Sequence, residues 1–293
     1  VALANSLCGQ DGMPLEADFL DLLALYYGLG VHVVDFVSDP ESARQAVNAW
    51  VLERTGDRIA NLLPAGSVTE LTRLVLVNAI YLRAAWARAF EPAQTANGPF
   101  TRRDGTALAV PRMHRIGDYR YVRSGAIQAV ELPYVGEQLS MVVLLPDPGQ
   151  LDAVVGSLDG PSLLATLEGL TPAMVEVWLP PFEFTSTFSL AESLQALGMV
   201  HAFGGADFTG ITSERVAITR VFHKAFVAVD EDGTEAAAAT AIVVDIDGGM
   251  PPDSTVPEII PFDVDRPFLF LIRDRTTGAV LFLGKVEDPS AGG

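Results

Sequence analysis

The chain has 293 residues, of which 49% are hydrophobic, and it carries a formal net charge of -18 at pH 7. This composition is typical of a globular protein, and the length allows one large domain or two smaller ones. A strong negative charge without any cluster of Lys and Arg argues against nucleic acid and against an anionic membrane surface as partners. No uncharged apolar run reaches the roughly 18 residues that a membrane-spanning helix requires.

The chain opens on apolar residues, Val1-Ala2-Leu3, without a methionine and without the basic start of a signal peptide. We therefore expect the natural protein to begin further upstream.

Cys8 is the only cysteine, so no disulfide forms within the chain. Because it lies in or beside an apolar strand, we interpret Cys8 as a small buried side chain rather than a nucleophile.

The hydrophobic pattern predicts a mixture of strands and helices along the chain. Strands are expected over residues 1–7, 31–36, 71–86, 175–179, 216–229 and 279–286, with several short strands between 100 and 146. Helices are expected over residues 15–27, 152–170 and 190–197, and after residue 39. Ser38 or Asp39 is expected to cap that last helix, with Pro40 at its first position. The nearly continuous apolar residues of 71–86 predict a strand that is buried on both faces.

Residues that could act as metal ligands or nucleophiles are scattered along the sequence. The four histidines, His32, His114, His201 and His223, lack the spacing of metal ligands, so no metal site is predicted. Gly156-Ser157-Leu158-Asp159-Gly160 is not a nucleophile elbow, because the serine directly follows the first glycine. We predict no catalytic residue, no cofactor and no enzymatic activity.

The stretch from Val229 to Pro267 contains conflicting local preferences. Four alanines after Thr234-Glu235 favour a helix, whereas Ile242-Val243-Val244 favours a strand, and glycines and prolines follow. In a strand, residues 234, 236, 238, 240, 242 and 244 would share one face without a charge, and Glu235 and Asp245 would lie on the other face. We infer a segment that is exposed in one state and becomes a central strand in another.

Several motifs resemble the serpin family. Glu231-Asp232-Gly233-Thr234-Glu235-Ala236-Ala237-Ala238-Ala239-Thr240 is similar to the reactive-loop hinge of serpins, and Asp265-Arg266-Pro267-Phe268-Leu269-Phe270 is similar to the strand after their loop. Val47-Asn48-Ala49-Trp50-Val51 resembles the serpin helix that crosses the large sheet, and Val77-Asn78-Ala79-Ile80-Tyr81-Leu82 resembles its third strand. The resemblance covers residue 2 to about residue 289 and is that of a bacterial member, and the family's N-terminal helices have no counterpart here.

The resemblance implies an α+β fold with three mainly antiparallel sheets surrounded by helices. Residues 1–293 would form a single serpin domain with an exposed reactive loop over about 231–262. It also implies a monomeric inhibitor of a serine or cysteine protease, extracellular or in the cell envelope, in which the cleaved loop inserts as a strand into the large sheet. The alternative is a non-inhibitory member that acts as a binding or chaperone-like protein, whose hinge would be expected to carry proline, charge or bulk.

The family's spacing, counted from Glu231, places the cleaved bond at Asp247-Gly248. The residues before it, Val244-Asp245-Ile246-Asp247, resemble sequences cut by aspartate-directed proteases of the caspase-like and granzyme-like kinds. In the alternative interpretation the two aspartates only keep an exposed loop in water, and a subtilisin- or elastase-like enzyme cuts after Ile246 or Met250.

Two polar residues, Asn78 and His223, lie in strands that are predicted to be apolar. They are interpreted either as satisfied polar groups of unrelated core strands or, as the resemblance implies, as a hydrogen-bonded cluster that holds the sheet closed where the loop enters. Both interpretations stay open from the sequence.

Overall fold

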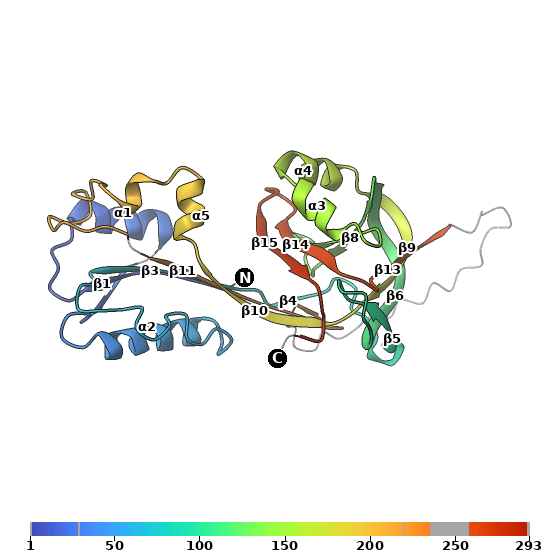
Figure 1. The fold of residues 1–293 in the computed structure, drawn as a ribbon, viewed down its shortest axis with the longest axis horizontal. Helices are drawn as coiled ribbons and strands as arrows, with labels where there is room; N and C mark the ends of the chain where they lie inside the picture. Colours follow the sequence, from blue (N-terminus) through green and yellow to red (C-terminus); the bar gives the residue numbers. More distant parts are fainter. Residues whose placement is uncertain (1, 29, 219, 235–257, 292–293) are drawn as a thin grey trace. The chain divides into compact units, whose positions relative to one another are not determined.

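A computed structural model describes residues 2–28, 30–218, 220–234 and 258–291. The chain forms two compact units, the first made of Val1–Leu82 and Thr185–Val227 and the second of Arg83–Phe184 and Ala228–Gly293 (Figure 1). The boundary falls within strands β10 (Phe182–Ser189) and β11 (Val221–Val229), which both units share. None of the helices within the described ranges is long and apolar enough to cross a membrane.

The first unit is a sheet with helices on both of its faces. Its strands are β1 (Ala2–Gln10), β2 (Val31–Val34), β3 (Leu74–Tyr81) and parts of β10 and β11, and its helices are α1 (Ala17–Tyr27), α2 (Pro40–Arg54), α5 (Ala191–Ala196) and the short η2 (His201–Phe203). The strand order is β2-β1-β3-β11, with β10 also paired to β11. The β1–β3 pair is antiparallel, whereas β1–β2 and β3–β11 are parallel. Helices α1 and α5 lie on one face and α2 on the other (Figure 1).

Helix α2 shows how the sequence fixes one of these helices. Asp39 is the N-cap, because its carboxylate accepts the N–H of Ser42 at 3.0 Å, and Pro40 opens the first turn. Of the two caps that the sequence allowed, the structure therefore has Asp39. The buried face includes Ala43, Val47 and Val51.

Cys8 is 1% exposed within β1. Burial raises its pKa to about 12, against a smaller opposite effect of the Ser6 side chain. The group is therefore a thiol at neutral pH, in agreement with its interpretation as a small buried side chain rather than a nucleophile.

The second unit is built on a long sheet. The strands of this sheet are β5 (Ala96–Thr101), β6 (Ala107–Ser124), β7 (Ile127–Pro133), β8 (Leu139–Pro146), β9 (Thr171–Leu179), β13 (Ile259–Asp263), β14 (Phe268–Asp274) and β15 (Val280–Val286). The unit also contains the short strands β4 (Ala84–Ala85) and β12 (Gly233–Thr234), which belong to the same sheet as β11. The order in the sheet is β13-β9-β6-β7-β8-β14-β15, with β5 also paired to β6. The described pairs are antiparallel except for β13 with β9.

The described part of the second unit contains three helical segments: η1 (Pro92–Gln94), α3 (Leu151–Ser157) and α4 (Gly160–Glu168). Val154 of α3 and Leu167 of α4 pack with Val142 of β8 and Leu271 of β14 in one buried cluster. This packing covers one face of the sheet with the two helices (Figure 1). The predicted α+β architecture is confirmed.

Two details of the predicted elements are wrong. Strand β3 is shorter than residues 71–86 and alternates between buried and more exposed positions, with Leu76 at 40% exposure, so it is not buried on both faces. The predicted helix 152–170 is two helices, because Asp159 forms a capping box with Ser162 and starts a new one.

One buried charge ties three strands of the second unit together. Glu131 of β7 is 2% exposed, and its carboxylate accepts hydrogen bonds from Arg273 of β14 at 2.6 Å and from the Ser140 hydroxyl of β8 at 2.8 Å. Burial by itself would raise the pKa of Glu131, but these hydrogen bonds and the charges of Arg273 and Arg275 outweigh it, so the net shift is downward.

We expect Glu131→Gln to lower the free energy of unfolding by about 3 kcal/mol at neutral pH, because it leaves Arg273 without its buried partner. The pKa of Glu131 is lower in the folded than in the unfolded protein. The contribution of the ionised Glu131 side chain to the free energy of unfolding is therefore complete above its pKa in the unfolded protein. This contribution is lost as the pH falls through its pKa in the folded protein. Urea denaturation of both proteins across this pH range measures the difference, which should shrink in acid.

The matched control is Glu137→Gln, because Glu137 pairs with Arg275 at 3.4 Å but its side chain is 70% exposed. This variant should change stability by less than about 1 kcal/mol. Equal losses in the two variants would contradict the role given to burial at Glu131.

Candidate functional site

The structure describes only the first part of the predicted hinge. Glu231, Gly233 and Thr234 lie in the described residues. Positions 235–240 of the hinge, Glu235, Ala236, Ala237, Ala238, Ala239 and Thr240, lie outside them, as does the predicted cleaved bond Asp247-Gly248. The geometry of the site is therefore that of the hinge base, residues 229–234, which belongs to the second unit.

The hinge base is a tight turn made by Asp230. The Asp230 carboxylate accepts the backbone N–H groups of Asp232 and Gly233, each at 3.0 Å, and its own N–H donates to the Gly233 carbonyl at 2.9 Å. These bonds reverse the chain, so that Thr234 pairs antiparallel with Val229. An aspartate that bonds its own backbone in this way is a strong local turn signal.

Strand β12 has a partner on each side. Val229 of β11 pairs with Thr234 on one side, and Ala84 and Ala85 of β4 pair with Thr234 and Gly233 on the other. The first two residues after the turn therefore already occupy an internal strand position. Thr234 is fully buried there, with 0% exposure.

Gly233 is required by the closeness of β4. A Cβ at this position would lie 2.2 Å from the carbonyl oxygen of Ala84 and 2.7 Å from the Cα of Ala85. Both are backbone atoms, which have little room to shift. The φ of Gly233 is +155°, which side chains rarely adopt, so any other residue would push β12 away from β4.

Trp86 holds the turn from the side. Its backbone N–H donates to the Asp232 carbonyl and its indole Nε1–H to the Asp230 carbonyl, both at 2.9 Å. The indole ring stacks on Tyr134, with 4.6 Å between ring centroids and 6° between planes. The Tyr134 hydroxyl in turn shares a 2.6 Å hydrogen bond with Thr234. Burial raises the pKa of Tyr134, so this hydroxyl stays protonated.

Glu231 fixes the outer side of the same turn. Its carbonyl accepts the Phe90 N–H at 2.9 Å, and its carboxylate accepts the Thr95 hydroxyl at 2.6 Å. Burial raises the pKa of Asp230 and the charges of Asp232 and Glu231 add to the rise, although hydrogen bonds from Gly233 and Asp232 oppose it. The hinge base is thus well bonded, and the carboxylates of Asp230, Glu231 and Asp232 form no ion pair with any residue that the structure describes.

The two polar residues singled out in the sequence meet in the first unit. His223 of β11 and Asn78 of β3 are direct register partners, and the His223 Nδ1–H donates to the Asn78 side-chain oxygen. The Asn78 amide Nδ2 donates to the Asn5 side-chain oxygen of β1 at 2.5 Å. Because the amide group is used this way, its oxygen faces His223, so the imidazole carries its proton on Nδ1. Burial lowers the pKa of His223.

Several contacts were not found from the sequence. Asn5 completes the hydrogen-bonded row Asn5-Asn78-His223, and its only signal was a polar residue in an apolar strand. The stacking of Trp86 on Tyr134 and the bond to Thr234 join segments far apart in the chain, for which the sequence offers no local signal. No group of three or more His, Cys, Asp and Glu side chains that could hold a metal ion occurs in the described part of the chain.

Comparison with known proteins agrees with this arrangement. An uncharacterized serpin-like protein of Thermococcus kodakarensis is 38% identical over 98% of this chain and 66% of its own length. Antithrombin-III of Mus musculus is 36% identical over 98% of this chain and 62% of its own length. Human thyroxine-binding globulin complexed with thyroxine superposes with a TM-score of 0.84 and 28% identity, over 98% of this chain and 74% of that one.

The chain spans 66% and 62% of the length of these two sequence relatives. The similarity is not confined to the hinge, since the family model for serpins (serine protease inhibitors) matches residues 1–289. The chain belongs to the serpin family.

Proposed function

We propose that the protein inhibits a serine or cysteine protease as a suicide substrate. The protease cleaves the reactive loop and forms an acyl intermediate with it, and the freed hinge then inserts as a strand beside β11. The observation that supports this most strongly is β12, where the first two residues after the hinge turn are already paired with β11 and β4. Insertion then extends an existing strand and does not have to nucleate one.

The register of β12 defines the path of insertion. Continuing the Val229–Thr234 pairing would set Ala236 opposite Val227, Ala238 opposite Ala225 and Thr240 opposite His223. At present Ala225 and His223 pair with Ile80 and Asn78 of β3. The inserting hinge must therefore replace the β3–β11 hydrogen bonds one pair at a time, including the bond between His223 and Asn78.

The side chains of the hinge decide whether this exchange is favourable. Fixing each residue costs about 1–2 kcal/mol of backbone entropy, whereas each new ladder hydrogen bond contributes about 0.5–1.5 kcal/mol net. These two effects nearly cancel, so burial of the inward face is decisive. Thr234, Ala236, Ala238 and Thr240 are small and uncharged, and Thr234 is already completely buried.

The chemistry of cleavage belongs to the protease. Its nucleophile adds to the Asp247 carbonyl, the bond to the Gly248 nitrogen breaks, and the new amine leaves while the Asp247 acyl group stays on the enzyme. Val244-Asp245-Ile246-Asp247 suits an aspartate-directed protease, with cleavage after Ile246 or Met250 as the alternative. We further propose that the two units form one serpin domain and that the protein is monomeric and acts outside the cell or in its envelope.

A non-inhibitory binding role is the alternative within the family. Human thyroxine-binding globulin, a structural neighbour, is a binding protein by its name. The hinge sequence favours inhibition, because its inward face carries no proline, charge or bulky side chain. Each of these would obstruct insertion into a sheet.

The first prediction concerns the inward face of the hinge. Ala236→Asp should abolish the covalent complex with the target protease while the loop is still cleaved, because insertion would bury an unpaired carboxylate. Ala237→Asp is the matched control, since the neighbouring alanine faces the opposite side of the same strand. The complex is measured as a band that survives SDS electrophoresis. An undiminished complex with Ala236→Asp, or equal loss in both variants, would refute strand insertion.

The second prediction concerns the cleaved bond. Incubation with an aspartate-directed protease should release a fragment that begins at Gly248, as identified by mass spectrometry. Asp247→Ala should reduce the rate of complex formation at least about 100-fold, because the side chain that the protease recognises is lost. Asp245→Ala should have a much smaller effect. A fragment that begins at Asp247 or Pro251 would instead assign the bond to Ile246 or Met250.

The third prediction concerns the row Asn5-Asn78-His223. Asn78→Ala removes both hydrogen bonds of the row, so it should lower the free energy of unfolding by roughly 1–3 kcal/mol. If the row holds β3 and β11 together against the loop, the variant should also lose inhibitory activity faster than the parent during storage without protease. Asn5→Ala, which leaves the His223–Asn78 bond intact, is the control. A loss of stability with unchanged storage behaviour would identify an ordinary core contact.

A further inference from the structure

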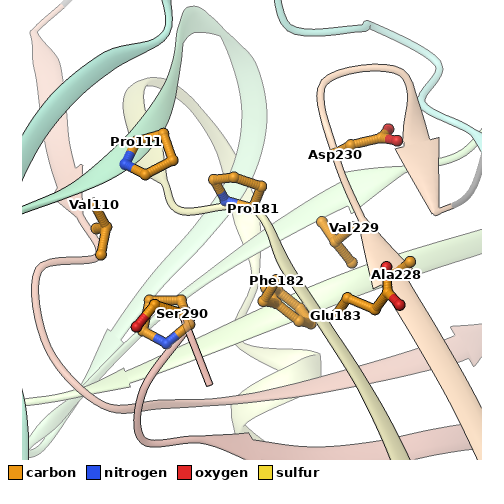
Figure 2. A pocket seen from close by; sticks show the side chains of 10 residues that line it. Val110, Pro111, Pro181, Phe182, Glu183, Ala228, Val229, Asp230 and Ser290 are labelled. Carbon is orange, nitrogen blue, oxygen red and sulfur yellow. The ribbon is translucent and has the colours of Figure 1, made fainter. Parts of the chain in front are cut away.

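Two hollows of the second unit differ in their chemistry. The larger has a volume of about 430 Å³ and apolar walls, with Pro111, Pro181 and Phe182 among them (Figure 2). The Asp230 carboxylate is not offered to this hollow, because backbone N–H groups of the hinge turn hold it. Walls of this kind do not select the charge or the donor pattern of a ligand. The smaller hollow, of about 310 Å³, adjoins Arg115 of β6.

Beside the smaller hollow, two arginines cross between β6 and the segment that precedes η1. Arg88 donates from Nη1 to the Asp118 carbonyl at 2.5 Å, and Arg115 donates from Nη1 to the Ala89 carbonyl at 2.6 Å. A Cβ at Gly117 would lie 3.8 Å from the Nη1 of Arg88. This guanidinium therefore lies over Gly117, on the face of β6 that also carries Arg115, and the two positive charges are neighbours.

Neither of these guanidiniums is neutralised by a carboxylate. Arg88 and Arg115 form no ion pair with any residue that the structure describes. The other three arginines of β6 all do so: Arg112 pairs with Asp263, Arg120 with Glu131 and Arg123 with Asp147. Because the chain has 37 acidic and only 19 basic side chains, two adjacent arginines without an acidic partner are unexpected.

The phenol of Tyr119 lies under the two guanidiniums and does not compensate their charge. Tyr119 is 5% exposed, and its Cε2 would lie 3.3 Å from the same Cβ at Gly117. Burial raises the pKa of Tyr119, and the charges of Arg115 and Arg88 only oppose this rise, so the phenol is uncharged at neutral pH. Its hydroxyl and the Nε of Arg115 are buried without a hydrogen-bond partner in the described part of the chain.

Two carboxylates near this place also leave the charge uncompensated. Asp118 alternates with Gly117 along β6, so its side chain leaves the opposite face of the strand. Glu91 lines the smaller hollow together with Arg115, but its carboxylate accepts the side-chain Nε2–H of Gln94 at 2.7 Å. Two guanidiniums beside one carboxylate leave a net positive charge.

We infer that Arg88 and Arg115 bind an oxyanion of the phosphate or sulfate type. Each arginine uses one N–H for a backbone carbonyl, and the remaining N–H groups of two guanidinium forks suit the several oxygens of such an ion. Arg88 is exposed and the smaller hollow opens beside Arg115, so the ion reaches both side chains from solvent. The binding does not depend on the proposed inhibitory function and is testable without a protease.

The position of this site connects it to the hinge base. Trp86, two residues before Arg88, donates its N–H to the Asp232 carbonyl, and Phe90, two residues after it, donates to the Glu231 carbonyl. An ion bound at Arg88 would therefore brace the segment that holds the hinge turn. Because only the folded protein presents this site, the bound ion also stabilises the fold.

The experiment measures binding of inorganic phosphate to the full chain by calorimetric titration, at about pH 8 and constant ionic strength in chloride. We expect one equivalent to bind, and acetate to bind at least about tenfold more weakly because it carries one negative charge instead of two. Methyl phosphate distinguishes the source of the group. Affinity equal to that of inorganic phosphate supports a phosphate carried on a larger molecule, and lower affinity supports the free ion. No saturation by phosphate up to about 20 mM, or equal affinity for phosphate and acetate, would overturn the inference.

Three variants locate the bound ion. Arg88→Gln should weaken phosphate binding at least about tenfold, and Arg115→Lys, which keeps the charge but loses the planar fork, at least about threefold. Arg83→Gln is the matched control and should change nothing, because it removes the same charge from another exposed arginine of the second unit. Equal losses in Arg88→Gln and Arg83→Gln would show that phosphate responds only to net charge. Thermal unfolding checks that each variant is folded, and phosphate should raise the unfolding temperature of the parent more than that of Arg88→Gln.

Discussion

The structure of the hinge depends on the turn at Asp230. One carboxylate receives two backbone N–H groups, and this reverses the chain so that Thr234 lies beside Val229. Trp86 donates hydrogen bonds to the carbonyls of Asp230 and Asp232. Its indole stacks on the ring of Tyr134, whose hydroxyl shares a hydrogen bond with the buried Thr234 hydroxyl. Each contact alone is worth about 1 kcal/mol, and together they hold Gly233 and Thr234 in the sheet as strand β12.

The position of β12 between β11 and β4 offers a physical reason for the amino-acid composition of the hinge. A two-residue strand with a partner on each side is the beginning of a ladder, and extending a ladder avoids the entropy of nucleating one. In the proposed insertion, the obstacle would be the parallel β3–β11 pairing, which already uses the hydrogen bonds that an inserting strand would need. A polar row such as Asn5-Asn78-His223 suits that boundary, because it is stable when complete and unfavourable when half broken. The small uncharged side chains of the hinge sequence would lower the free-energy cost of the proposed insertion.

Much of this arrangement was predictable from the sequence. A cap at Ser38 or Asp39 and most of the strands and helices followed from local patterns and spacing. The resemblance brought Asn78 and His223 together as one of two open interpretations. The burial of β3 was not predictable, because an apolar run such as residues 71–86 indicates that a strand contributes to the core but not which of its two faces is buried. Likewise, Trp86 and Asp230 are far apart in the chain, and so are Tyr134 and Thr234, although each pair is joined by a hydrogen bond. Such contacts depend on the tertiary fold rather than on any local preference.

The most direct test of the account is the unfolding temperature of the protein before and after its loop is cut. Insertion of the hinge would add a central strand with small buried side chains, so the account predicts that the cut protein unfolds at a clearly higher temperature than the intact one. Differential scanning calorimetry of the two forms measures this difference. An unchanged or lower unfolding temperature after complete cleavage would contradict the claim that the hinge base is the beginning of an inserting strand.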